Sequence, residues 1–244
     1  MRKIRKNVIV TILILTLGAS TALLAYLHFF AADDRRLSGE WTGELHMTEQ
    51  AAVTALGWLQ DMEAVKVTLE DVESCMQELT VQIDLTLEQT ARGEGTFQCN
   101  VLPESYDACR QAAYEGFAEA FRGLLAERLR MAGYAEGTDG EAVEALVIET
   151  FGMSTVSYLM TCGPALLPSL EELQAGYDGS GVYEAAEGIL TRQFETGGAG
   201  AVRSERYIRK DASLILLEET GSGDSKKALD RYPVVYTLKQ PQVR

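Results

Sequence analysis

The chain has 244 residues, of which 46% are apolar and 24% are charged, and its formal net charge at pH 7 is −14. This composition is typical of a globular protein and excludes a chain that is disordered throughout. The excess of acidic side chains argues against nucleic acid and anionic lipid headgroups as partners, because like charges repel. A cation or a basic partner is compatible with it, as is a plain solvated surface.

Residues 8–30 carry no charged side chain when His28 is counted as neutral. A helix of that length rises roughly 34 Å, enough to cross a hydrocarbon core of about 30 Å. Four basic residues precede the segment, so the positive-inside rule puts the N-terminus in the cytoplasm. We therefore expect residues 1–32 to form a cytoplasmic tip and a single-pass anchor in the cell membrane, with the remaining chain outside. The alternative is a signal peptide cleaved near Ser20-Thr21-Ala22.

Strict alternation of apolar and polar residues predicts strands over residues 39–47, 79–88 and 96–101. A helix is predicted between the first two, over residues 49–63. Residues 64–77 are ambiguous, and a short strand followed by a short helix is one interpretation. The expected apolar stripe of this helix consists of Val53, Leu56, Leu59 and Met62.

The period then changes from two to between three and four, which predicts a long amphipathic helix over residues 104–133, closed by Gly133. A second helix is predicted over residues 139–152, and residues 154–175 are interrupted by prolines. The stripe of the long helix consists of Phe117, Phe121, Leu124 and Met131, and that of the second helix of Val143, Leu146, Val147 and Phe151. Packing into the core is one role for the first stripe, and binding a lipid or a partner helix is the other.

Alternation returns in five short segments between residues 177 and 240, which brings the number of predicted strands to about eight. Eight antiparallel strands, each with one apolar face, favour a small closed barrel. The expected fold is therefore α+β: a transmembrane helix, then an eight-stranded antiparallel barrel with an inserted helical subdomain. Its parts are residues 33–103 (first strands), 104–176 (helical insertion) and 177–240 (remaining strands).

The first strand opens with Gly39-Glu40-Trp41, which resembles the Gly-x-Trp signature of lipocalin-like domains. The resemblance implies an eight-stranded barrel closed at one end by Trp41, with an arginine packed on its ring. Arg206, Arg209 and Arg231 are the candidates for that arginine.

The overall layout is also similar to that of uncharacterised membrane-anchored or lipid-anchored bacterial proteins. The shared features are the Gly-x-Trp strand, the helix start within residues 45–50, a helical insertion and a Tyr232-Pro233 strand near the end. This second resemblance spans residues 37–240 and implies a fold without a function. In contrast to a true lipocalin, the chain has a helical block between its strands, and no helix is expected after the last one.

The four cysteines, Cys75, Cys99, Cys109 and Cys162, all follow the membrane segment. Two disulfides are one alternative in an oxidising compartment, and buried free thiols are the other. Their spacing matches no zinc motif, so no metal site is expected. His46 is the only histidine outside the membrane segment, on the polar face of its strand, which argues against histidine-based catalysis.

The sequence shows no catalytic motif, and its many carboxylates follow no pattern that brings two of them together. A carboxylate-based hydrolase is therefore a minor alternative. We expect a non-enzymatic, membrane-anchored binding or interaction module without a cofactor. A small apolar ligand would lie in the barrel, near Trp41, Leu45, Ile83, Phe97 and Tyr236. The alternative is a structural or envelope protein whose helical insertion docks a protein partner.

Overall fold

The computed structural model describes residues 37–60, 67–134, 139–195, 202–220 and 232–239. The predicted transmembrane segment, residues 8–30, lies outside these described residues. Within them, no single helix is both long and apolar enough to cross a membrane. Helices Gly140–Phe151 and Thr155–Cys162 reach the required length and apolar composition only when taken together, and a bend of 57° separates them.

Eight antiparallel strands form a closed barrel in sequence order, with the last strand paired to the first. This confirms the predicted α+β fold and its barrel. The strands are β1 (Gly39–His46), β2 (Thr80–Ala91), β3 (Glu94–Val101), β4 (Gly179–Ala186), β5 (Ile189–Phe194), β6 (Val202–Lys210), β7 (Ser213–Glu219) and β8 (Val234–Leu238). Closure leaves no long strand edge exposed, which is the usual protection of such sheets against aggregation.

Tight turns join the later strands where the sequence offers residues that tolerate positive φ. Glu187 and Gly188, between β4 and β5, have φ of 52° and 80°. Positive φ at both central residues is the mark of a type I′ turn, whose twist matches that of the flanking strands. Asp211, between β6 and β7, likewise has a φ of 51°.

The described residues form six helices, and the last four lie between β3 and β4. They are α2 (Thr48–Gln60), α3 (Leu69–Cys75), α4 (Pro103–Met131), α5 (Gly140–Phe151), α6 (Thr155–Cys162) and α7 (Leu170–Tyr177). Although residues 103–177 separate them, β3 and β4 pair directly, with Cys99 opposite Gly179. The helical segment therefore leaves and re-enters the barrel at the same place.

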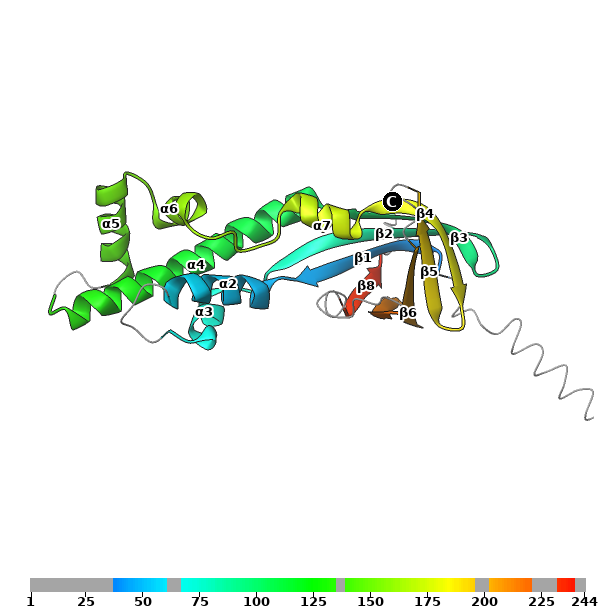
Figure 1. The fold of residues 1–244 in the computed structure, drawn as a ribbon, viewed down its shortest axis with the longest axis horizontal. Helices are drawn as coiled ribbons and strands as arrows, with labels where there is room; N and C mark the ends of the chain where they lie inside the picture. The colour runs from blue at the N-terminus through cyan, green and yellow to red at the C-terminus, as the bar shows by residue number, and fades with distance from the viewer. Residues whose placement is uncertain (1–36, 61–66, 135–138, 196–201, 221–231, 240–244) are drawn as a thin grey trace, which may run out of the picture.

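The helices extend from one end of the barrel as an arm (Figure 1). We use "arm" for α4, α5 and α6. Helix α4, with 29 residues, is about 43 Å long at 1.5 Å per residue. It begins at Pro103, whose fixed φ suits the first helical position, and is followed by Gly133 with a φ of 91°. Helices α5 and α6 lie at the far end of the arm from the barrel.

The chain returns from α6 to α7 along the side of α4. The prolines predicted to interrupt a helix, Pro164 and Pro168, lie in this return segment. Two tyrosines of α4 hold this segment in place. Tyr114 donates to the carbonyl oxygen of Pro164 at 2.8 Å, and Tyr106 to that of Pro168 at 3.0 Å. Because both hydroxyls are part-buried and paired, the return segment is fixed against the arm.

One large apolar core joins the barrel interior to the near half of the arm. The stripe predicted for the helix after the first strand is only partly correct. Val53 is 51% exposed, Leu59 is buried, and Met62 lies outside the described residues. The buried side of α2 consists instead of Ala51, Ala52, Ala55 and Leu59. Small side chains allow close helix packing here.

Candidate functional site

The five residues predicted to bind a ligand all lie in the barrel interior. Trp41, Leu45, Ile83, Phe97 and Tyr236 are each no more than 5% exposed. They come from β1, β2, β3 and β8, and alternation turns each of them inward. The structure therefore brings these residues into one apolar interior, as the sequence indicated.

Aromatic rings of this interior lie directly on glycines of the barrel wall. A Cβ atom on Gly43 would be 2.8 Å from the Tyr236 ring and 3.1 Å from Ile83. A Cβ atom on Gly179 would be 2.5 Å from the Phe194 ring. All three distances are shorter than a normal carbon–carbon contact, so the neighbouring side chains occupy the space that a residue larger than glycine would need.

Trp41 is fully buried near the start of β1. Its indole Nε1 donates to the carbonyl oxygen of Leu37 at 3.0 Å. The guanidinium carbon of Arg209, on β6, lies 5.7 Å from the centre of the ring. Arg209 is thus the arginine that packs on this tryptophan. A cation over an indole face at this distance is favourable.

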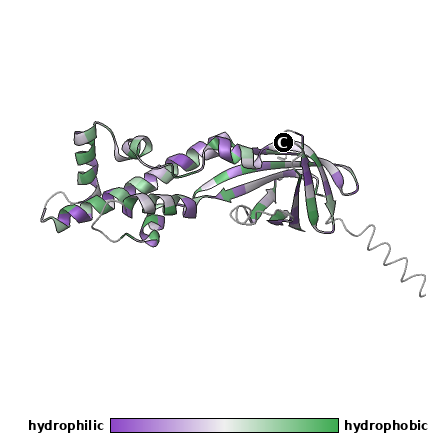
Figure 2. Cartoon of the chain, in the orientation of Figure 1, coloured by the Kyte–Doolittle hydropathy of each residue, from purple (hydrophilic) through white to green (hydrophobic). Residues whose placement is uncertain are grey.

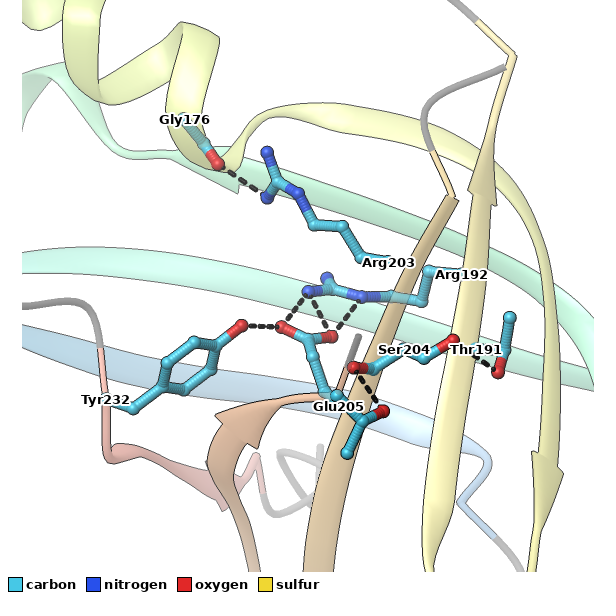
Figure 3. A network of polar contacts seen from close by, with 8 residues as sticks. Gly176, Thr191, Arg192, Arg203, Ser204, Glu205 and Tyr232 are labelled. Carbon is cyan, nitrogen blue, oxygen red and sulfur yellow. Dashed lines mark hydrogen bonds and ion pairs between the residues drawn. The ribbon is translucent and has the colours of Figure 1, made fainter. Parts of the chain in front are cut away.

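A charged network lies deep in the same interior, among the apolar side chains (Figure 3). Arg192 on β5 donates twice to the Glu205 carboxylate on β6, with both hydrogen bonds at 2.8 Å. Tyr232 donates to the same carboxylate at 2.6 Å. The side chains of Arg192 and Glu205 are 5% and 3% exposed.

The electrostatics of this network favour a fixed ion pair. Desolvation alone lowers the pKa of Arg192, but the adjacent Glu205 carboxylate and other neighbours more than offset it, so the pKa is raised overall. Burial, reinforced by Glu205, raises the pKa of Tyr232 far above its usual range. Arg192 also lies 5.5 Å from the centre of the Phe97 ring. A charged guanidinium with a fully engaged carboxylate suits a structural tie between β5 and β6 rather than proton transfer.

Sequence reasoning missed this pair, although the signal was present. The inward positions of β5 are Leu190, Arg192 and Phe194, so an arginine occupies a core position. An inward glutamate on the neighbouring strand is the matching signal. Opposite charges at inward positions of adjacent strands indicate a buried ion pair.

The four cysteines are free thiols. Cys99 and Cys109 are buried, as alternation and helical spacing indicated. Burial raises the pKa of Cys109 to about 11 and also raises that of Cys99, so both stay protonated at neutral pH. His46 is exposed and lies 3.3 Å from Glu78. No group of metal-binding side chains occurs among the described residues.

The far end of the arm exposes apolar side chains. We call this region the tip and define it as residues 128–134 and 139–162. Exposed apolar side chains of the tip are Met131, Tyr134, Leu146, Ile148, Phe151, Met153 and Met160, which are 37% to 62% exposed. Figure 2 shows hydrophobic residues recurring along α5 at this end. Of the apolar stripe expected for the second helix, Val143 and Val147 are buried, whereas Leu146 and Phe151 are exposed. Met131, at the end of the stripe expected for the long helix, is exposed as well.

The tip has a small core of its own, made by Ala126 of α4 with Val143 and Val147 of α5. Beside it, Arg122 and Glu144 form an ion pair at 3.1 Å. Glu144 also accepts a hydrogen bond from the backbone N–H of Thr155, at the start of α6, at 3.2 Å. The nearby side chain of Thr155 lowers the pKa of Glu144 most, and the Thr155 backbone N–H and Arg122 lower it further, against the opposing effect of partial burial. One carboxylate thus connects α4, α5 and α6.

A hollow of about 740 Å³ lies between α4 and α5 at the tip. Four carboxylates and one guanidinium line it. Its charged residues are Glu119, Arg122, Asp139, Glu141 and Glu144. A separate hollow of about 500 Å³ lies outside the lumen, between the start of α2, residues 165–168 and α7. Of these two hollows, the one between α4 and α5 combines an acidic lining with exposed apolar side chains nearby on α5.

Comparisons of the chain with protein-family models, with curated proteins and with solved structures gave no match.

Proposed function

We propose that this protein is a non-enzymatic interaction module, anchored in the membrane by residues 8–30, that docks a protein partner at the tip of its arm. In this proposal the barrel is a rigid scaffold and the arm is the functional element. The single observation that carries the proposal is the exposed apolar surface of the tip. Monomeric proteins rarely expose such groups together unless another surface covers them.

The location of this surface supports the proposal. The tip lies at the end of α4 away from the barrel. Val143 and Val147 of α5 belong to a core separate from the main one, which Leu159 of α6 joins. Exposure of Ile148 and Phe151, each 48%, is therefore not a by-product of barrel packing. A spacer of about 43 Å would hold the docking surface well away from the anchor.

The barrel supports the role of scaffold, and we propose that it is lipocalin-like. The Gly39-x-Trp41 opening and the contact of Arg209 with Trp41 both favour this relationship. The sequence also suggested that the protein binds a small apolar ligand in the barrel lumen. Such a ligand would have to displace packed rings such as Tyr236 and Phe194, so we place the interaction at the tip.

The anchor and the arm are at opposite ends in this proposal. Strand β1 runs from Gly39 toward α2 and the arm, so residue 37 enters the barrel at the end away from the arm (Figure 1). A membrane segment preceding it would therefore leave the tip free on the extracytoplasmic side. That arrangement suits a partner in the envelope or on its surface.

The test is recovery of the partner with the full chain, purified from its own membranes in mild detergent. The tip variant combines Ile148→Gln and Phe151→Gln in α5, where glutamine has good helix propensity, with Met153→Gln just after the helix. The matched control, Val182→Thr, Val202→Thr and Ile208→Thr, changes barrel residues that are 49%, 55% and 50% exposed.

We expect the tip variant to lose the stoichiometric partner of the wild type, while the control keeps it. Removing three apolar contacts from an interface core costs on the order of 1 kcal/mol or more each, enough to reduce recovery at least about tenfold. Equal recovery with both variants, or loss with the barrel variant alone, would show that the tip is not the docking surface.

A further inference from the structure

We infer that the partner docked by the tip is a protein whose contact surface combines apolar side chains with lysines or arginines that enter the acidic hollow between α4 and α5. This inference rests on the proposed docking function and specifies the chemistry of the partner. It follows from the order of residues along α5, from the charges in the hollow and from the distribution of cations in the sequence.

One side of α5 changes from acidic to apolar along its length. Glu141, Glu144 and Ile148 are three and four residues apart, so they share a face of the helix. Glu141 and Glu144 line the hollow, and Ile148 follows one turn later. Phe151 continues this face and contacts Tyr158 of α6, with ring centres 4.5 Å apart. The hollow and the apolar surface are therefore parts of one continuous face.

The negative charges of the hollow are only partly compensated. Of the four carboxylates in the hollow, Glu144 pairs with Arg122 and Asp139 accepts from the backbone N–H of Ala142. Glu119 and Glu141 are exposed and form no ion pair with the described residues. Two free carboxylates at the edge of an apolar surface favour a partner with basic side chains at matching positions.

The tip carries Arg128 and Arg130 at the end of α4, but a long stretch of the sequence after them is free of cations. Between Arg130 and Arg192 there is no Lys, Arg or His, but there are ten Asp or Glu residues. Residues 150–170 carry no charge at all. Helices α5 and α6 have none of the Lys or Arg side chains that membrane-surface helices usually carry on their polar side, so a bilayer is disfavoured as the occupant of this face. A second copy is disfavoured too, because it would bring Glu119 and Glu141 against acidic residues of the same face.

The experiment places the photoreactive residue p-benzoylphenylalanine at Ile148 of the full chain in its own membranes. Adducts are identified by mass spectrometry after irradiation. A charge-reversal variant, Glu119→Lys with Glu141→Lys, is compared with a control, Glu88→Lys with Glu184→Lys, which reverses two exposed carboxylates of the barrel. None of these four side chains takes part in the ion pair of Arg122.

We expect an adduct to a partner peptide in which lysine or arginine accompanies apolar residues. Charge reversal should lower its yield on the order of tenfold, since two close charge pairs become repulsive, and the barrel control should leave it unchanged. An adduct to lipid, to a second copy or to a segment without basic residues overturns the inference but keeps docking. An unchanged yield on charge reversal also overturns it. Absence of any adduct at Ile148 contradicts docking itself.

Discussion

Replacing Arg192 with methionine is expected to destabilise the protein by about 3–5 kcal/mol, because the Glu205 carboxylate would remain buried without its cation. The two side chains are 5% and 3% exposed, so water cannot replace the lost partner. The measurement is the free energy of unfolding in urea, followed by the fluorescence of Trp41 and Trp58.

The matched variant removes the whole network by combining Arg192→Met, Glu205→Leu and Tyr232→Phe. It leaves no buried charge and no orphaned hydroxyl, so we expect it to be much closer in stability to the wild type than Arg192→Met alone. A loss below about 1 kcal/mol for the single variant would mean that the Glu205 carboxylate is reached by water. A larger loss for the triple variant than for the single one would also contradict the structure.

The second large effect is expected for Trp41→Ala, which should cost about 3–5 kcal/mol because it opens a cavity in the barrel core. The loss includes the hydrogen bond to Leu37 and the contact with Arg209. Trp41→Phe keeps most of the ring volume and should cost clearly less. The free energy of unfolding of both variants is measured in urea by circular dichroism. Fluorescence is less suitable here because each variant lacks one of the two tryptophans.

Trp58→Phe is the control, because Trp58 lies in the helical part and is only partly buried. Its ring packs on Phe117, with centres 5.6 Å apart, outside the barrel lumen. If Trp41→Ala were no more destabilising than Trp58→Phe, Trp41 would not be the closing residue of the barrel that its position indicates.

The strands were predictable because each carries one apolar face over several residues. In β2, Val81, Ile83 and Leu85 alternate with polar residues, and the structure buries all three. Such alternation fixes both the strand and its inward side. That the strands on both sides of the helical segment share one barrel followed from counting them, since neither group alone closes a barrel.

The helix faces were less predictable because hydrophobicity alone does not say what packs against a helix. Alanine contributes little to an apolar stripe, yet Ala51, Ala52 and Ala55 form the buried side of α2. On α5, Val143 and Val147 are buried against α4, whereas Leu146 and Phe151 are each 48% exposed. Whether an apolar residue faces a core or a partner depends on the tertiary arrangement of the helices. The spacing of apolar residues along a helix carries no information about that arrangement.

The candidate site was therefore anticipated only as an alternative. The expected stripe of the long helix proved to be core at Phe117, Phe121 and Leu124, but Met131 is 59% exposed at the tip. The hollow joins residues of α4 and α5 that are separated by a turn, so no local pattern revealed it. The absence of cations before Arg192 was visible in the sequence, but its meaning depends on where the tip lies.

The most direct measurement tests whether β1–β3 and β4–β8 join into one barrel. The position of the arm outside the barrel depends on this joining. Thr42 of β1 lies opposite Thr237 of β8, and Gln98 of β3 opposite Ser180 of β4. Opposite residues of antiparallel strands have Cα atoms about 4.5–5.5 Å apart, within the range for a disulfide. Thr42→Cys with Thr237→Cys, and separately Gln98→Cys with Ser180→Cys, should therefore cross-link on mild oxidation. Thr42→Cys with Thr191→Cys, on strands that do not pair, should not. Failure of both designed pairs in a folded chain would show that the front and rear strands belong to separate cores.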